Sequence, residues 1–273
     1  MDLFAGLQRV MLSAGFRGDL HSTLLLYGLV LARLAAAISL SPFLGGQSVP
    51  MRMRLGLAAV ITAILVPSMA PAGSVTAIDA VALLAKEILL GSLIGFLAQA
   101  VFYGIEMAGA LVDTQRGMNQ ITLYTPQLPG PASVLGLLQV QAAIALFFTF
   151  DGHLYFVRAL ADSFTAIPAA KFPAMAAGGL ALAELVLRVS AQLFVVAIRL
   201  AAPVLLALFL LDVCFGLFNR VAAQIPIHSE NQTVKALVSL VILVLIMPIL
   251  AGQLREYPQV LFRQITDLVA GFR

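Results

Sequence analysis

The chain has 273 residues, of which 61% are hydrophobic and only 11% are charged, and its mean hydropathy is +1.02. Soluble domains carry about 25% charged residues, and a soluble fold of this length has too little interior to bury so much apolar surface. The formal charge of +3 is small and dispersed, which argues against nucleic-acid binding. The composition predicts an integral membrane protein or a subunit of a membrane-embedded complex.

The first segment, Met1 to Leu20, mixes charged and apolar residues and predicts an amphipathic helix, not a cleaved signal peptide. Apolar runs follow near residues 23–42, 55–70, 79–112, 132–150, 179–217 and 236–251. A spanning helix needs about 20 apolar residues, so the third and fifth runs exceed one ordinary span.

Each over-long run predicts either a helical hairpin or a long helix that continues beyond the hydrocarbon. Pro203 offers a break in the fifth run, whereas the third run contains no proline and predicts a single bent helix. Gly91-Ser-Leu-Ile-Gly95 in the third run matches the small-xxx-small pattern of close helix packing. With no long polar insert and no repeat, we expect one all-α domain over residues 1–273, built from long kinked helices and helical hairpins.

The distribution of basic residues does not assign the connections clearly to one side of a membrane or the other. Arg52 and Arg54 mark one loop as cytoplasmic, but nearly every later connection also carries lysine or arginine, and tryptophan is absent. A helix bundle surrounded by lipid is a poor fit to this pattern. A chain surrounded by other protein subunits would not be bound by the rule, because its neighbours replace the lipid.

Polar side chains form stripes inside the two long runs. Gln99, Glu106 and Asp113 are seven residues apart and share one helical face. A second stripe lies on one face of the fifth run: Glu184, Arg188, Gln192 and Arg199. Charges inside a membrane mark both buried pairs and functional paths. The stripes therefore either join this chain's own helices or face partner subunits or a water-filled path, and the sequence leaves both open.

The most distinctive polar segment is Asp113-Thr114-Gln115-Arg116-Gly117, which lies between two apolar runs. A loop with Pro126, Pro129, Gly130 and Pro131 follows it. A charge at bilayer depth costs at least about 2.5–3.5 kcal/mol unless it faces protein or water. This segment is therefore the first candidate for a functional role.

Enzyme signatures are missing from the sequence. His21, His153 and His228 are widely separated, and neither H-E-x-x-H nor G-x-S-x-G occurs. Asp151-Gly152-His153 predicts a turn that ends one helix at Phe150 and starts an interfacial helix at Leu154. The sequence therefore predicts no catalytic, cofactor-binding or metal-binding residue.

Several landmarks occur in a fixed order. The central one is Ala108-Gly109-x-Leu111-Val112-Asp113-x-Gln115-Arg116-Gly117, with Pro126 beyond it. The others are Pro42 with Val49-Pro50-x-Arg52; Gly152-His153 with Ser163 and Pro168; and Ala201-Ala202-Pro203 followed by Asp212, Gly216, Leu217, Asn219-Arg220, Ala222, Gln224 and Lys235. In order and spacing these resemble the FliR/SctT family, the export-gate subunits of flagellar and virulence type III secretion systems.

One block departs from the family. Its usual Arg-x-x-Pro-Gln-x-Asn-x-Phe stands here as Arg220-Val-Ala-Ala-Gln224-Ile-Pro-Ile-His228, so the local shape and contacts of that turn are not carried over. The segment from Asp212 to Arg220 resembles the virulence (injectisome) branch more than the flagellar one.

The resemblance implies a non-enzymatic subunit of the bacterial inner membrane, within the basal body of the secretion system. Family members join FliP/SctR-like and FliQ/SctS-like subunits in a helical, hetero-oligomeric pore. That pore receives unfolded secreted proteins from FlhB/SctU-like and FlhA/SctV-like proteins. Much of the assembly lies above the membrane plane, which would account for the over-long helices and the poor charge topology.

The resemblance also implies site residues. The plug-like loop falls at about Met118 to Pro131. The loop and its anchors are expected at Asp113, Gln115, Arg116, Gly117, Met118 and Pro126. Polar contacts with subunits or inside the membrane are expected at Gln99, Glu106, Glu184, Arg188, Arg199, Asp212, Arg220, Gln224 and Lys235. Of these, Arg220, Gln224 and Lys235 would hold a C-terminal helical hairpin. Two plainer alternatives stay open: Arg116 neutralises Asp113 at a helix end, and Lys235 caps a span.

A secondary transporter is the alternative function, with the two charged stripes forming a midplane substrate or proton site. That class usually contains an internal repeat with broken helices at matching positions, and the sequence has none. An intramembrane enzyme built around Asp151 and His153 is a weaker third reading.

Overall fold

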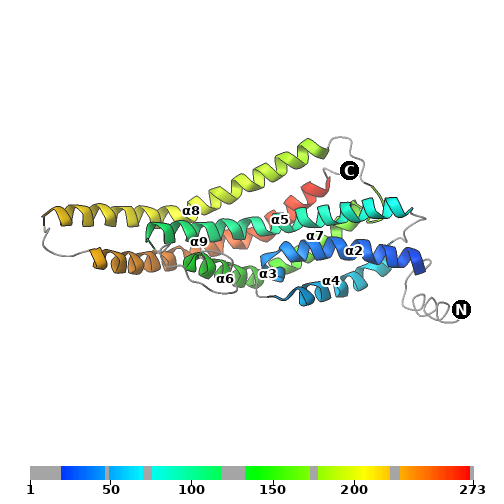
Figure 1. Cartoon of the computed structure of the whole chain (residues 1–273), viewed down its shortest axis with the longest axis horizontal. Coiled ribbons are helices and arrows are strands. Elements are labelled where there is room, and N and C mark those ends of the chain that lie inside the picture. The colour runs from blue at the N-terminus through cyan, green and yellow to red at the C-terminus, as the bar shows by residue number, and fades with distance from the viewer. Residues whose placement is uncertain are drawn as a thin grey trace. The chain divides into compact units, whose positions relative to one another are not determined.

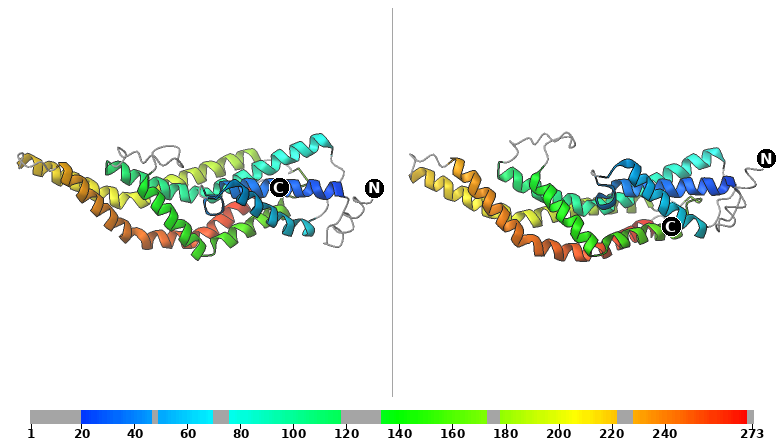
Figure 2. Two further views of the ribbon diagram at one scale, coloured as in Figure 1. Left: turned by 60° about the horizontal axis from the view of Figure 1, so that its bottom comes forward. Right: turned by 90° about the horizontal axis from the view of Figure 1, so that it is seen from below.

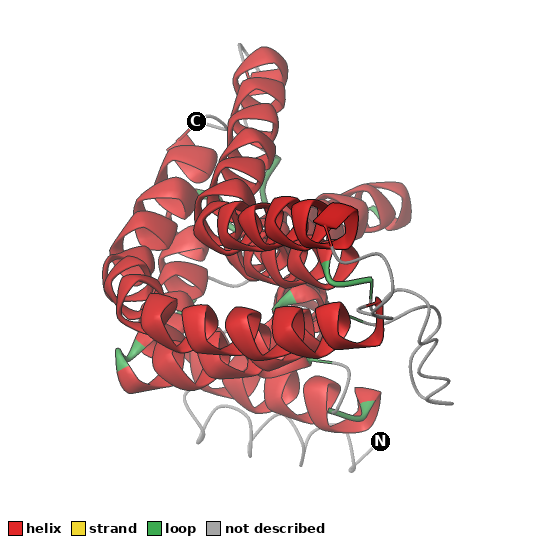
Figure 3. Ribbon diagram, turned by 90° about the vertical axis from the view of Figure 1, so that its left-hand side faces the viewer, coloured by secondary structure: helices red, strands yellow, loops and turns green. Residues whose placement is uncertain are grey.

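The computed structural model describes residues 20–46, 49–69, 76–117, 133–172, 178–221 and 228–270 (Figure 1). Within these ranges every regular element is a helix (Figure 3), so the all-α prediction is confirmed. In chain order the elements are α2 (Leu20–Leu40), α3 (Pro42–Gly45), α4 (Met51–Leu65), the 3₁₀ helix η1 (Val66–Ser68), α5 (Ala77–Gln115), α6 (Val134–Thr149), α7 (Gly152–Ala166), α8 (Gly178–Val221) and α9 (His228–Ala270).

Three helices are much longer than a bilayer requires. The helices α5, α8 and α9 contain 39, 44 and 43 residues, which at about 1.5 Å per residue is about 58–66 Å. The third and fifth apolar runs are therefore single helices and not hairpins, and Pro203 lies inside α8 without ending it.

The last helix extends well beyond the apolar run at 236–251. Leu254, Leu261, Ile265 and Leu268 are buried at helical spacing, so an amphipathic continuation carries α9 to Ala270. Counted by length and composition, five described helices are suited to cross a membrane, or six if α6 and α7 together form one broken span.

The chain forms two compact units. Unit 1 contains Met1–Gln99, His153–Val186 and Gln259–Arg273, and unit 2 contains Ala100–Gly152 and Leu187–Pro258. The helices α5, α8 and α9 each contribute residues to both units (Figure 1). The single-domain expectation stays a prediction.

In unit 1, α5 packs closely on α2. A Cβ atom at Gly91 would collide with the backbone carbonyl of Arg33, and one at Gly95 would lie 2.9 Å from the carbonyl oxygen of Ala37. The small-xxx-small pattern predicted such packing, and the structure confirms it. The close approach brings polar groups of the two helices together inside the unit.

A buried ion pair crosses this interface. Arg33 on α2 and Glu87 on α5 are both fully buried, with 2.5 Å from Nε to Oε2 and 2.9 Å from Nη2 to Oε1. Arg33 also donates from Nη1 to Ser163 Oγ at 3.0 Å and from Nη2 to the carbonyl oxygen of Ile167 at 2.9 Å. Its guanidinium carbon lies 4.1 Å from the centroid of the Phe164 ring. One guanidinium thus joins α2, α5 and the end of α7.

Lys86 extends this cluster. Its Nζ lies 2.7 Å from Glu87 Oε1 and donates to the carbonyl oxygens of Pro168, Ala169 and Lys171 at 3.1, 3.0 and 2.8 Å. Carbonyls after a helix end lack intrahelical partners and attract cations. The two cations therefore stabilise the segment that follows α7.

In unit 2, aromatic rings and close backbone contacts form the core. The rings of Phe102 on α5 and Phe147 on α6 meet edge to face at 5.5 Å, and Tyr257 on α9 lies 6.3 Å from each. Gly104 brings α5 close to α8, because a Cβ there would lie 2.8 Å from the carbonyl oxygen of Leu193. The helices α8 and α9 run side by side within this unit (Figure 2).

The turn at Asp151-Gly152 is present as predicted. Helix α6 ends at Thr149 and α7 begins at Gly152. Asp151 adopts a φ of 58°, a left-handed conformation that aspartate tolerates better than most residues. This observation supports a turn and not an active-site cluster.

Replacing Glu87 with leucine is expected to lower the free energy of unfolding by about 3–5 kcal/mol, because it leaves the buried Arg33 uncompensated. The double variant Arg33→Met/Glu87→Leu should recover most of that loss. The measurement is the thermal unfolding midpoint of the detergent-solubilised protein. Arg158→Gln is the control, since its side chain is 77% exposed and its ion pair with Asp162 is 4.0 Å long. A Glu87→Leu midpoint equal to the control's would contradict the expectation.

Candidate functional site

The polar segment that ends α5 lies in unit 2, where its side chains contact α6 and α8. It stands at the base of the connection between α5 and α6. The contacts form two clusters, one centred on Asp113 and the other on Asp212. Both consist of carboxylates that accept hydrogen bonds from neighbouring helices.

Asp113 fastens the start of α6 to the end of α5. Its Oδ2 accepts hydrogen bonds from Ser133 Oγ at 2.7 Å and from the backbone N–H of Leu135 at 3.0 Å, and its Oδ1 accepts one from Arg116 Nη1 at 3.2 Å. Ser133 is the N-cap of α6, since its Oγ accepts from the N–H of Gly136 at 2.9 Å. A carboxylate at a helix N-terminus satisfies orphan donors and opposes the positive end of the helix dipole.

The structure shows which groups the predicted anchors Asp113 and Arg116 bind. The sequence predicted that Asp113 and Arg116 fix the loop against neighbours. In the structure the partners of Asp113 lie on the same chain, 20 and 22 residues further on. The plainer alternative for Arg116 also holds, because its ion pair with Asp113 spans a single turn at the end of α5. One carboxylate therefore joins both ends of the connection.

The second cluster links three helices. Gln115 on α5 donates from Nε2 to Asp212 Oδ2 on α8 at 3.3 Å, and Lys235 on α9 forms an ion pair with Asp212 Oδ1. Lys235 is buried and lies two turns inside α9, so it does not cap a helix end. Asp212 therefore connects the loop base to the pair formed by α8 and α9.

Gly117 permits the change of direction after α5. The helix ends at Gln115, the N–H of Gly117 donates to the carbonyl oxygen of Thr114 at 3.1 Å, and the φ of Gly117 is +75°. An L-residue at this φ places its Cβ against the following carbonyl, whereas glycine does not. Glycine is therefore the residue that fits this turn without backbone strain.

The predicted α5 stripe does not share one environment. Asp113 is buried, Glu106 is exposed and Gln99 is partly buried. The reason is that the start of α6 covers Asp113, so helical spacing alone could not assign its surroundings.

Four of the remaining predicted residues lie on α8 and are exposed: Glu184, Arg188, Arg199 and Arg220. Arg220 lies in the last turn of that helix. Three predicted site residues lie outside the described part of the chain: Met118, Pro126 and Gln224.

The sequence reasoning missed several polar residues that the structure places at contacts. These are Arg33, Lys86, Glu87 and Ser133. Charges inside the apolar runs 23–42 and 79–112 were a usable signal for Arg33 and Glu87. Because 54 positions separate the two, spacing could not identify them as partners.

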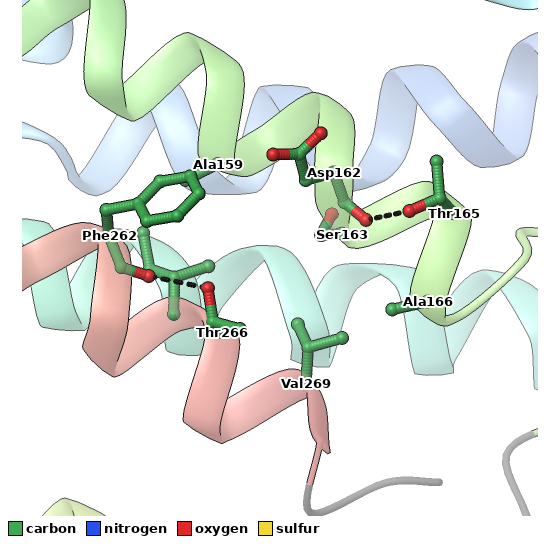
Figure 4. Close-up of a pocket in the computed structure, with 9 residues that line it drawn as sticks. Ala159, Asp162, Ser163, Thr165, Ala166, Phe262, Thr266 and Val269 are labelled. Carbon is green, nitrogen blue, oxygen red and sulfur yellow. Dashed lines mark hydrogen bonds between the residues drawn. The ribbon is translucent and has the colours of Figure 1, made fainter.

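Unit 1 contains a small pocket between α7 and the end of α9 (Figure 4). Its volume is about 250 Å³, and much of its lining is apolar, including Ala159, Phe262 and Ile265. The hydroxyls of Thr165 and Thr266 donate to carbonyls of their own helices, those of Asp162 and Phe262 (Figure 4). The pocket therefore lacks the convergent free polar groups of a ligand site.

Metal chemistry finds no support in the described ranges, since no group of three His, Cys, Asp or Glu side chains there is placed to hold an ion. The described polar groups form helix caps and ion pairs between helices. Such an arrangement can hold segments in place.

Comparison with known proteins is consistent with this kind of site. Residues 24–259 match the family described as "Bacterial export proteins, family 1". The chain is 31% identical to the flagellar biosynthetic protein FliR of Escherichia coli (strain K12) over 251 residues, 91% of this chain and 94% of that protein. It is 32% identical to Yop proteins translocation protein T of Yersinia pestis over 226 residues, 81% of this chain and 85% of that protein.

A third relative is the secretion system apparatus protein SsaT of Salmonella typhimurium, 28% identical over 166 residues, 61% of this chain and 63% of that protein. The flagellar FliR and the Yop proteins translocation protein T are thus matched at nearly equal identity. The preference for the virulence branch stays a prediction.

Substituting Asp113 with alanine should loosen the first turn of α6, because hydrogen bonds to its carboxylate are lost from Ser133 and Leu135. Bonds to charged groups contribute about 1.5–3 kcal/mol each, so amide hydrogen exchange at residues 134–138 should accelerate about 10- to 100-fold. Hydrogen-exchange mass spectrometry checks this. Asp162→Ala on the exposed face of α7 is the control and should leave those amides unchanged. Equal exchange in the two variants would refute the capping role.

Gly117→Ala is expected to destabilise the protein by about 1–2 kcal/mol, because an L-residue is strained at a φ of +75°. Gly216→Ala is the matched control, since a Cβ there meets no atom within 4 Å and alanine favours a helix interior by about 1 kcal/mol. The two substitutions should shift the thermal unfolding midpoint in opposite directions. Shifts of the same sign would count against strain at Gly117.

Proposed function

We propose, since the chain belongs to the bacterial export proteins of family 1, that it is a non-enzymatic core subunit of a type III secretion export gate. Membership of the family and similarity to flagellar and type III secretion proteins give the chain a role in a protein-export apparatus. In our proposal this subunit helps to form the entry pore for unfolded secreted proteins across the bacterial inner membrane.

The proposal rests on one observation: hydrogen bonds and ion pairs hold the residues next to the α5–α6 connection. Asp113 joins the two ends of that connection, and Asp212 ties its base to α8 and α9 through Gln115 and Lys235. A loop that must close a pore needs a rigid support on packed helices. Residues 118–131 would be that loop, with Asp113, Gln115, Arg116 and Gly117 as its support.

Helix length and exposure support an assembly with other subunits. The three long helices exceed the hydrocarbon thickness of about 30 Å, and their apolar side chains are exposed over much of their length. We propose that FliP/SctR-like and FliQ/SctS-like subunits cover these surfaces. FlhB/SctU-like and FlhA/SctV-like proteins would deliver the substrates.

The secondary transporter is the second candidate. It would need the charged stripes of α5 and α8 to form one site. Among the described residues, no ion pair joins Glu106 of the first stripe to Arg199 of the second. An experiment on the binding of a small solute is therefore not the first one to perform.

Co-expression of the tagged chain with its neighbouring genes, followed by native mass spectrometry of the detergent-purified complex, tests the proposal. We expect one copy of this chain with several copies of another membrane subunit. A monomer or a small homo-oligomer, in a sample where the candidate subunits are expressed and soluble, would overturn it. If the complex forms, deleting residues 118–131 should abolish secretion and leave the complex intact.

A further inference from the structure

Helix α4 differs from the other candidate spans in length and exposure. Together with η1 it covers Met51–Ser68, 18 residues, which at about 1.5 Å per residue is about 27 Å. This length is close to the hydrocarbon thickness of about 30 Å. Only 17% of the span is buried, against 44% for the span of α2, and the other continuous spans described are 39 residues long. Helix α4 therefore combines the length of a bilayer span with a mostly uncovered surface.

The inner face of α4 is covered within unit 1. Helix α4 packs against α2 (Figure 1), and the hydroxyl of Tyr27 donates to the carbonyl oxygen of Ala59 at 2.9 Å. Thr62 is buried, and its hydroxyl donates to the carbonyl oxygen of Ala58 at 2.7 Å. Because Thr62 is the only polar residue from Leu55 to Leu65, no polar side chain of this stretch lies on the outer face.

The outer face of α4 is apolar. Its most exposed side chains are Ile64, Met53 and Val60, with exposed fractions of 70%, 66% and 59%. Apolar surface of this kind is unfavourable in water. Helices that associate inside a membrane are held by hydrogen bonds and by close packing of small residues, and none of these three side chains is small or donates a hydrogen bond. Acyl chains require neither property, so lipid is the environment that fits this face.

The two ends of the span differ in charge. Arg52 and Arg54 lie in its first turn, whereas residues 55–78 carry no charge. Arg54 donates to the carbonyl oxygen of Gly46 at 2.7 Å, so its guanidinium is used within the chain. Arg52 is exposed, and no aspartate or glutamate occurs at positions 20–78. An exposed cation at one end only is typical of the cytoplasmic end of a span.

We propose that the outer face of α4 contacts the acyl chains of the membrane and that Arg52 binds the phosphate of a phospholipid at the cytoplasmic surface. A guanidinium binds phosphate oxygens through two parallel hydrogen bonds. The anionic lipids of the cytoplasmic leaflet also attract basic residues next to a span. The length of the span then places Pro67 and Ser68 near the opposite headgroups. This inference goes beyond the proposed function, because it does not depend on which subunits cover α8 and α9.

Photo-cross-linking in bacterial membranes tests the contact with lipid. A photo-reactive amino acid is placed at Val60 or Ile64 of the chain, co-expressed with its neighbouring genes, and mass spectrometry identifies the molecule that it captures. Both positions should yield phospholipid adducts. Leu245 on α9, 69% exposed, is the matched control, and under the proposed function it should capture a protein subunit.

A second measurement tests the role of Arg52. The purified complex is mixed with micelles that contain phosphatidylglycerol, and native mass spectrometry measures the fraction that retains this lipid. Arg52→Gln should weaken retention about fivefold, because the phosphate loses its cation. Arg52→Lys keeps the charge and should retain most of the binding. Arg158→Gln is the control and should behave as wild type, since Arg158 already forms an ion pair with Asp162.

The opposite results are distinct. Cross-links from Val60 and Ile64 to another protein, or no lipid adduct at either position, would overturn the contact with lipid. Equal retention of phosphatidylglycerol by wild type and Arg52→Gln would overturn the contact with phosphate. Capture of lipid at Val60 together with no protein captured at Leu245 would count against the proposed function and leave this inference standing.

Discussion

The structure of unit 1 depends on one carboxylate. Glu87 binds Arg33 and Lys86, and these two cations hold the carbonyl groups that follow α7. An uncompensated charge in a buried position is strongly destabilising, so none of the three side chains can be satisfied unless α2, α5 and the end of α7 meet in one arrangement. The glycines of α5 make that arrangement possible by letting the backbones approach.

In unit 2 a buried carboxylate of α5 again binds groups of a neighbouring helix. Asp113 lies there, and it accepts from both the N-cap residue Ser133 and the backbone of Leu135. Buried carboxylates on one helix thus fix two connections, the segment after α7 in unit 1 and the base of the α5–α6 connection in unit 2. Four of the five charged residues of α5, Asp79, Lys86, Glu87 and Asp113, make such specific contacts.

The exposed surfaces of α8 and α9, in contrast, consist largely of apolar side chains. Exposed leucine, valine and phenylalanine side chains on α8 and α9 are too extensive for water, and the helices are too long for the hydrocarbon layer alone. The buried charges Arg33, Glu87, Asp113 and Lys235, in contrast, are paired within the described part of the chain.

The sequence by itself determined the class of the protein. Composition required a membrane-associated chain, the length of two apolar runs required either long helices or helical hairpins, and ordered landmarks around Asp113 and Gly117 indicated the export family. Composition, run length and motif order depend only on the linear sequence, so they can be determined without knowing any tertiary contact. Only the tertiary structure decided which charges meet. Arg33 and Glu87 are 54 positions apart, and Glu106 is exposed although it shares a helical face with the buried Asp113. Pairing and burial depend on which helix covers which face, and that is set by the packing of distant segments and not by the spacing within one.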